Sequence, residues 1–232
     1  MKRFILLTYI FVLGGVWISP VAASTITTTS QFTGSLQESW ESFPNFNTGP
    51  SFLSEPAAIM GGAASIFSSS ALGNSMRIYE PGPANWALGL SGFAQVADGD
   101  KGMATATDEQ INILFTTPVT EFGSYWAAST SFGGIFPPDP ATINLDFYDL
   151  FDSLIGSASF TYGSGSGDGV LAWHGWNSST PIKKIAFQNT FDGVTIAVDS
   201  LQANPVPEPT TMLLLGSGLI GLAGMRRRFK KV

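Results

Sequence analysis

Residues 111–123 read INILFTTPVTEFG, and this stretch decides the fold class of the chain. The apolar residues Ile111, Ile113 and Phe115 stand at every second position, which turns their side chains to one face of a β-strand. A second alternating run covers residues 194–201. Alternation of this kind leaves one face buried and one face wet, as in antiparallel sheets.

Short apolar runs separated by Gly, Pro, Asn and Asp continue this pattern through the middle of the chain. They predict strands, and no helical periodicity of useful length competes with them. Strands this short and this closely spaced indicate an all-β fold, an antiparallel two-sheet sandwich of jelly-roll type over residues 24–204. The expected strands are residues 25–32, 75–79, 86–93, 110–116, 120–127, 142–148, 154–162, 170–173, 182–188 and 194–202, with a short one near 64–67.

The charges of the 232-residue chain are separated along its length. Two basic residues open the chain and five close it, whereas the part between them holds four basic and all 17 acidic residues, a formal charge of −13. A body this acidic argues against a nucleic-acid partner, because a phosphate backbone requires a basic face. The chain has no cysteine, which excludes disulfides, thiol catalysis and zinc–thiolate sites.

The N-terminus has the three parts of a secretory signal peptide. Lys2 and Arg3 precede an apolar run over residues 4–18, and small residues follow. Val21 and Ala23 occupy the positions that a signal peptidase reads if cleavage falls between Ala23 and Ser24. Residues 1–23 are therefore expected to be a signal peptide, with an uncleaved anchor helix as the alternative.

The C-terminus combines a Pro-rich stretch, an apolar segment and a basic tail. Residues 205–209 predict a stiff, extended linker, and the largely apolar stretch of 16 residues at 210–225 predicts one short transmembrane helix. The basic tail 226–232 should stay on the cytoplasmic side, which places the acidic body outside. The basic cluster consists of Arg226, Arg227, Arg228, Lys230 and Lys231.

This tail resembles the PEP-CTERM sorting signal in all three of its parts. The motif residues are Val206, Pro207, Glu208 and Pro209. The resemblance implies a Gram-negative, exopolysaccharide-producing bacterium, and recognition and cleavage near the motif by exosortase, a membrane-embedded enzyme. Such tails are also labelled ice-binding protein C-terminal domains, a label that concerns the tail and implies no ice binding.

The body carries a second resemblance, in residues 111–123, 143–149 and 194–201. Many PEP-CTERM proteins have bodies that look like lectin-type jelly-roll sandwiches with segments of this kind. Their last strand commonly holds two adjacent acidic residues, whereas this chain has only Asp199 there. Any ion site that the resemblance implies is weakened accordingly.

Two groups of side chains are candidates for ligand binding. The acidic residues Asp146, Asp149 and Asp152 stand near a turn, where oxygen atoms could hold a structural Ca²⁺; the alternative is that they stabilise the turn itself. Trp173 and Trp176 could stack on a sugar ring, and the alternative is that they pack in the core.

Catalytic signatures are weak. His174 is the only histidine, and no nucleophile elbow or paired metal-binding histidine accompanies it. We therefore expect a non-enzymatic protein of the cell envelope or exopolysaccharide matrix, held at the inner membrane until exosortase processes it. The alternatives are a carbohydrate-binding module that contacts extracellular polysaccharide and, third, a secreted hydrolase.

Overall fold

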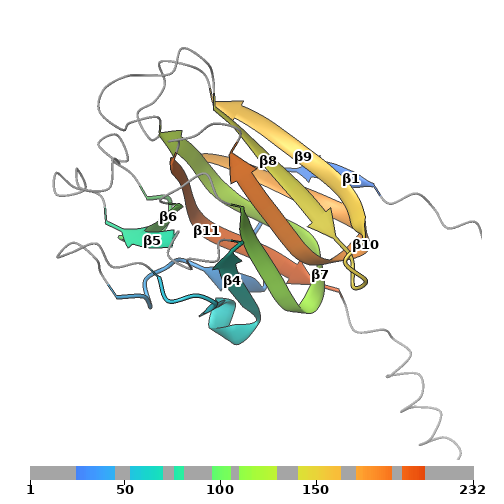
Figure 1. Cartoon of the computed structure of the whole chain (residues 1–232), viewed down its shortest axis with the longest axis horizontal. Helices are drawn as coiled ribbons and strands as arrows, with labels where there is room; N and C mark the ends of the chain where they lie inside the picture. Colours follow the sequence, from blue (N-terminus) through green and yellow to red (C-terminus); the bar gives the residue numbers. More distant parts are fainter. Residues whose placement is uncertain are drawn as a thin grey trace, which may run out of the picture.

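The computed structural model describes residues 25–44, 53–69, 76–80, 96–105, 110–129, 141–162, 171–189 and 195–206 (Figure 1). The expected signal peptide, the strand at 86–93, the apolar segment 210–225 and the basic tail lie outside these residues. Within them, no helix is both long and apolar enough to cross a membrane. The elements are β1 (Ile26–Thr29), β2 (Leu36–Glu38), β3 (Ala57–Ile59), the 3-10 turn η1 (Met60–Gly62), β4 (Ala64–Ser68), β5 (Met76–Tyr79), β6 (Gly102–Thr105), β7 (Ile111–Ser129), β8 (Ala141–Tyr148), β9 (Leu154–Tyr162), β10 (Ala172–Asn189) and β11 (Thr195–Pro205).

All of these strands belong to one hydrogen-bonded sheet, and every pairing among them is antiparallel. The order along the sheet is β5-β6-β11-β7-β10-β8-β9, while β1 pairs with β10, β2 with β11 and β4 with β7. The all-β, antiparallel expectation is confirmed. The jelly-roll connectivity stays a prediction.

The strand β7 contains the stretch that opened the sequence analysis, and it is longer than predicted. Two separate strands, at 110–116 and 120–127, were expected, with a break at Pro118. The structure instead runs through this proline as one strand of 19 residues. Opposite this point the register between β7 and β10 shifts, between Asn177 and Ile182 and again between Ile182 and Lys184. Register shifts let a strand bend, so β7 continues from one layer of the fold into the other.

The strand β10 corrects the prediction in the same way. Residues 170–173 and 182–188 were expected to be separate strands, but β10 spans both and the Gly-, Ser- and Pro-containing segment between them. Its first half pairs with β1 and with the second half of β7. Its second half pairs with β8 and with the first half of β7. The two long strands therefore carry the sheet around a corner, and its halves face each other (Figure 1).

The core lies between these halves and is built on aromatic rings. Trp126, on the second half of β7, is fully buried and meets Phe187 on the second half of β10 with ring centroids 5.1 Å apart. Trp176, on the first half of β10, meets Phe147 of β8 at 5.7 Å. Phe160 of β9 contacts both tryptophans, at 5.7 and 6.0 Å. These contacts join the two layers because each crosses from one half of the bent sheet to the other.

The last strand, β11, extends further than predicted. The strand was expected to end at residue 202, with a linker beginning at Pro205. In the structure, Pro205 still pairs with Val119, and the Val206 N–H donates to the Pro118 carbonyl over 3.0 Å. Pro205 and Val206 therefore belong to the folded body rather than to a linker.

Replacing Trp126 by Ala should lower the free energy of unfolding by about 3–5 kcal/mol, because the change leaves a ring-sized cavity between the layers. Urea unfolding followed by far-UV circular dichroism measures this loss. The matched control is Phe151→Ala, which removes an exposed aromatic ring and should change stability by no more than about 0.5 kcal/mol. Equal midpoints for the two variants would contradict the proposed role of Trp126.

Candidate functional site

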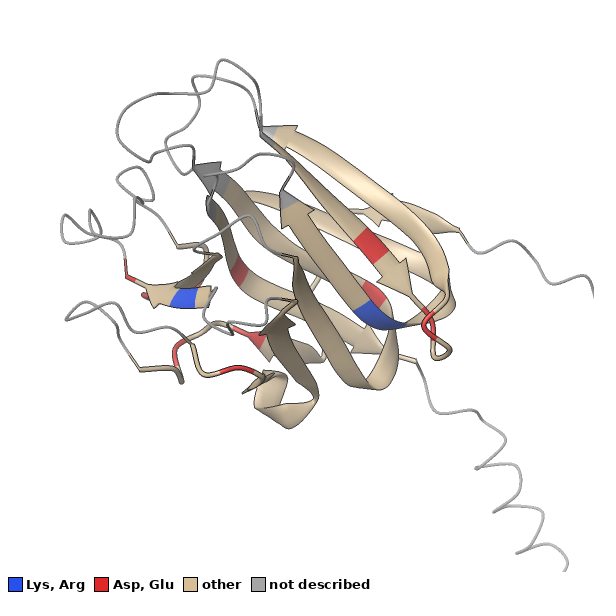
Figure 2. Ribbon diagram, in the orientation of Figure 1, with Lys and Arg blue, Asp and Glu red and all other residues tan. Residues whose placement is uncertain are grey.

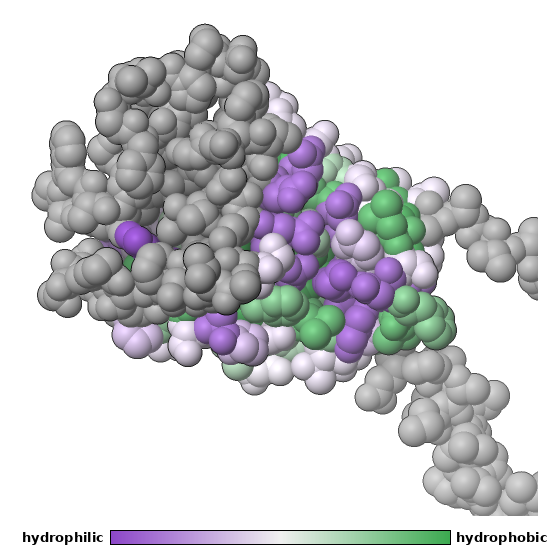
Figure 3. Space-filling model, in the orientation of Figure 1, coloured by the Kyte–Doolittle hydropathy of each residue, from purple (hydrophilic) through white to green (hydrophobic). Residues whose placement is uncertain are grey.

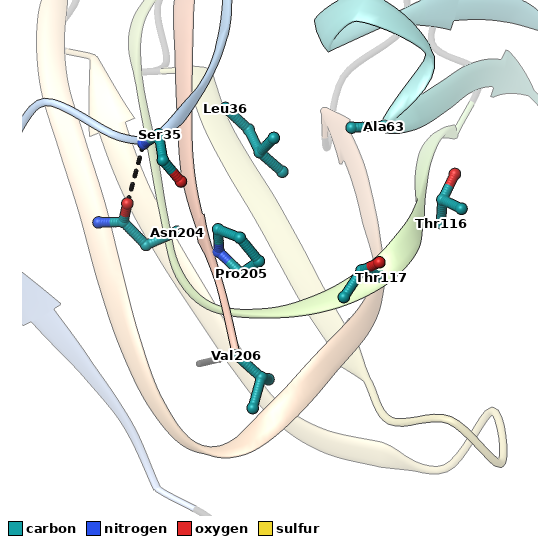
Figure 4. A pocket seen from close by; sticks show the side chains of 8 residues that line it. All are labelled: Ser35, Leu36, Ala63, Thr116, Thr117, Asn204, Pro205 and Val206. Atoms are coloured by element: carbon teal, nitrogen blue, oxygen red, sulfur yellow. Dashed lines mark hydrogen bonds between the residues drawn. The ribbon is translucent and has the colours of Figure 1, made fainter. Parts of the chain in front are cut away.

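A cavity of about 620 Å³ lies where the described chain ends (Figure 4). Leu36, Ala63, Pro205 and Val206 supply its apolar walls, with Thr116 and Thr117 on the side of β7. Asn204 is bonded within the protein through both ends of its amide: the Ser35 N–H donates to Asn204 Oδ1 over 2.9 Å, and Asn204 Nδ2 donates to Glu121 Oε2 over 2.6 Å. These bonds hold the end of β11 to its neighbours. The expected sorting-motif residues Pro207, Glu208 and Pro209 follow directly, outside the described residues.

A second, smaller cavity of about 160 Å³ lies where the edge strands β1 and β9 approach each other. The two strands pack closely, since a Cβ placed on Gly156 of β9 would lie 2.5 Å from the Ile26 side chain of β1. Clefts for drug-sized ligands measure about 300–1,000 Å³, so this cavity suits one ring-sized group. Its lining residues are Thr28, Thr29, Ser159, Phe160, Trp173, His174, Gly175 and Trp176.

Trp173 is one of the half-buried aromatic residues that line this cavity, with Phe160 and His174. Its ring lies over two glycines: a Cβ on Gly123 would come within 2.4 Å of the indole, and one on Gly175 within 2.9 Å. Phe32 and Tyr125 meet the ring edge-on, with centroids 5.5 and 5.4 Å away. The Trp173 Nε1 donor is buried and has no hydrogen-bond partner among the described residues. A buried donor without a partner is costly, and a water or ligand oxygen would satisfy it.

Trp176 does not join Trp173 in an exposed pair. Side chains alternate between the two faces of a strand, so residues three positions apart, such as Trp173 and Trp176, point to opposite faces. Trp176 is only 3% exposed and packs against Phe122, Phe147 and Trp126. Trp176 is therefore a core-packing residue, although it also lines part of the cavity. Trp126, against which Trp176 packs, is likewise a core residue.

His174 stacks on Phe160 with ring centroids 3.9 Å apart and an interplanar angle of 9°. Burial lowers the pKa of His174, because the charged imidazolium loses hydration there. The ring is therefore neutral at pH 7 and acts as part of an aromatic stack. Sequence reasoning missed Phe160, Thr28, Thr29 and Ser159 as cavity residues, since only the pairing of β1 with β10 and the packing of β9 brings them together.

The three aspartates considered for calcium have separate partners. Asp146 accepts a hydrogen bond from the Ser157 hydroxyl over 2.6 Å. Asp149 Oδ1 accepts from the N–H groups of Phe151 and Ser153 over 2.8 and 2.9 Å, and Asp152 pairs with Lys184. No group of three or more histidine or acidic residues among the described residues could hold a metal ion. The structure does not bring these carboxylates together, and the calcium site stays a prediction.

Asp199 is the buried acidic residue of the last strand, and it anchors the loop before β6. Its carboxylate accepts the N–H groups of Ala97, Asp98 and Ser200. Glu41 holds the other end of the same loop by accepting the N–H groups of Asp100 and Lys101 over 2.6 and 2.8 Å. The loop at residues 98–100 is thus bound through its backbone by two carboxylates.

Desolvation raises the pKa of Asp199 to about 6, against the lowering effect of its three backbone hydrogen bonds and with a smaller rise from nearby Asp98. The same burial raises the pKa of Tyr79, with a further rise from Asp199. Charged groups are otherwise sparse over the described strands (Figure 2). Asp199 is therefore a buried group whose charge responds to mildly acidic pH.

The last strand of the all-β body leads directly into the Pro-Glu-Pro sequence at residues 207–209. Residues 205–228 match the model of the PEP-CTERM protein-sorting motif. The chain is therefore a protein that carries a PEP-CTERM sorting motif. The match begins at Pro205, the residue that ends β11.

No curated protein matches the chain. Three solved structures resemble it at low identity. A DUF4465 family protein from Bacteroides caccae has 12% identity over 77% of this chain and 99% of its own, with a TM-score of 0.42. The CBM22-1 xylan-binding domain from Paenibacillus barcinonensis Xyn10C has 9% identity over 77% and 100%, with a TM-score of 0.39. TmCBM61 in complex with β-1,4-galactotriose has 13% identity over 62% and 88%, with a TM-score of 0.36. Likenesses this weak carry no functional inference.

The pKa of Asp199 makes stability depend on pH. The folded-state pKa of about 6 lies above the ordinary 3.8. The folded protein therefore binds this proton more tightly than the unfolded chain does, and the stability that this adds is present below about pH 4 and is lost as the pH rises through about 6. The loss amounts to at most about 3 kcal/mol.

Urea unfolding of the unmodified chain and of Asp199→Asn, at pH values from 4 to 7, tests this effect. As the pH rises, the free energy of unfolding of the unmodified chain should fall relative to that of Asp199→Asn. Parallel pH curves would show that Asp199 does not titrate in this range.

Proposed function

We propose that this chain is an exported protein of the bacterial cell envelope or exopolysaccharide matrix, delivered through its C-terminal sorting motif by exosortase. The observation that carries the proposal is the match of residues 205–228 to the PEP-CTERM motif. The apolar segment 210–225 and the basic tail after it would hold the chain in the inner membrane before processing. The signal peptide at residues 1–23 would begin export.

The charge distribution supports this orientation. Both ends of the chain are basic and the part between them is acidic. Cations next to an apolar segment stay on the cytoplasmic side, so both ends would lie inside and the body outside. A body without cysteine needs no oxidant to fold after export.

The mass of the mature protein tests the sorting proposal. In cells with the sorting enzyme, we expect loss of residues 1–23 and of the segment that follows the motif. In cells lacking the enzyme, the C-terminal segment should remain and the protein should stay in the membrane fraction. An unchanged C-terminus in both strains would contradict processing, and Glu208→Ala serves as the motif variant for comparison.

The body itself is proposed to be non-enzymatic. Its single histidine is stacked on Phe160, and burial lowers the pKa of that histidine. Such a ring is suited to packing against an apolar group rather than to cycling a proton at neutral pH. For the alternative of a hydrolase, we identify no catalytic residue among the described side chains.

A second candidate function is carbohydrate binding by the cavity between β1 and β9. Trp173 lines this cavity, and its indole N–H lacks a partner among the described residues. Thr28, Thr29 and Ser159 add hydroxyl groups at the rim. An apolar ring face beside hydroxyls and one free donor matches the two-sided chemistry of a pyranose, whose one face is apolar while its edge is polar.

Replacing Trp173 by Ala should weaken binding to extracellular polysaccharide by about tenfold or more, the equivalent of about 1.4 kcal/mol. Affinity electrophoresis against polysaccharide from the producing cells measures the change. Phe151→Ala is the matched control, because it removes an aromatic ring that lies outside the cavity. Equal mobility of both variants and the unmodified chain would show that the cavity is not a glycan site. Circular dichroism is the control that both variants are folded.

A further inference from the structure

The turn between β8 and β9 exposes large apolar side chains. Phe151 is 87% exposed, Leu150 59% and Leu154 57%. Only Leu114, at 38%, joins them as an exposed large hydrophobic residue in the described part of the chain. Scattered exposed residues are ordinary, but a contiguous apolar group marks a contact surface.

Strand pairing places Leu114 and Leu154 in one row, with Lys184 and Tyr148 between them. Leu114 of β7 pairs with Lys184 of β10, Lys184 pairs with Tyr148 of β8, and Tyr148 pairs with Leu154 of β9. The four positions form one row across four strands, and Leu150 and Phe151 extend it at the turn. We call Leu114, Tyr148, Leu150, Phe151 and Leu154 the apolar row. In the space-filling view, apolar surface gathers at the end of the molecule that carries the β8–β9 turn (Figure 3).

The acidic residues of the turn are neutralised or engaged by the protein. Asp149 caps the turn by accepting the N–H groups of Phe151 and Ser153, and its own N–H donates to the Ser153 carbonyl over 3.0 Å. Asp152 has a left-handed φ of 61° and pairs with Lys184, whose ammonium also lies 4.0 Å from the centre of the Tyr148 ring. The turn therefore presents Leu150 and Phe151 from a backbone that its own hydrogen bonds hold in place.

The point at which the chain leaves the body lies at the same end of the fold. Val206 bonds to Pro118, which follows Leu114 by four residues on β7, a distance of about 13 Å along a strand. Figure 1 also draws the β8–β9 turn and the end of β11 at one end of the molecule. The apolar segment 210–225 begins four residues after Val206, so an extended connection spans at most about 14 Å.

We propose that the apolar row contacts the surface of the lipid bilayer while the C-terminal segment anchors the chain. This inference rests on the proposed export and anchoring. The connection of three residues, 207–209, keeps the end of the body that bears Val206 next to the membrane, and this end carries the apolar row. Phe151 and Leu150 then enter the interfacial region, where apolar and aromatic side chains lose contact with water.

The absence of cysteine allows a direct test, because one introduced thiol can be labelled alone. Phe151→Cys and the matched control Thr161→Cys, an exposed position at the other end of β9, each receive an environment-sensitive fluorophore. The chain is purified from membranes of cells lacking the sorting enzyme. It is then placed in nanodiscs of phosphatidylethanolamine and phosphatidylglycerol, with or without spin-labelled lipid.

The label at residue 151 should shift to shorter wavelength and lose at least half of its emission to spin-labelled lipid, whereas the label at residue 161 should remain as in water. A water-like label at 151 in a chain that remains in the nanodisc would overturn the contact and leave anchoring intact. A chain that does not enter nanodiscs would overturn the anchor and, with it, this inference. A shift of the label at residue 151 to shorter wavelength that depends on the number of chains per disc, without quenching by spin-labelled lipid, would mean that the apolar row contacts a second copy of the chain instead.

Discussion

The contact between aromatic rings across the bent sheet is the constraint on which the rest of the structure depends. Trp126 and Trp176 lie on the halves of β7 and β10 that form one layer, and they pack against Phe147, Phe160 and Phe187 of the other. This packing fixes the corner of both long strands. The corner in turn brings β1 beside β9, where the small cavity lies, and it sets the row that runs from Leu114 to Leu154.

Buried or shielded carboxylates fix the loops of a chain that has no disulfide. Glu38, which is 8% exposed, accepts the N–H groups of Trp40 and Met60, two residues with left-handed φ values of 66° and 54°. Glu41 and Asp199 hold the loop before β6 in the same way. Hydrogen bonds from backbone N–H groups to a carboxylate are stronger than neutral ones, so they can hold segments that have little apolar surface of their own.

The fold class could be predicted from residues 111–123, because alternation of apolar side chains reports which face a strand buries. The continuity of β7 and β10 could not, since Pro118 and the residues between Gly175 and Pro181 look like breaks in a single sequence. Pro118 and residues 178–181 lie at the corner, where the pairing between β7 and β10 is interrupted. The cavity around Trp173 depends on strand pairing between distant segments. The exposed row had a local signal, two large apolar residues between Asp149 and Asp152, but its function depends on where the chain leaves the body.

The end of β11 has a consequence for the body once the tail is removed. The strand is complete at Pro205, and its final hydrogen bond is the one that Val206 donates to Pro118. A cut at any bond beyond Val206 would leave every backbone pairing described here in place. The sheet would then keep its folding free energy whether the protein is tethered or released. Removal of the tail would therefore change the location of the protein without changing the fold of its body.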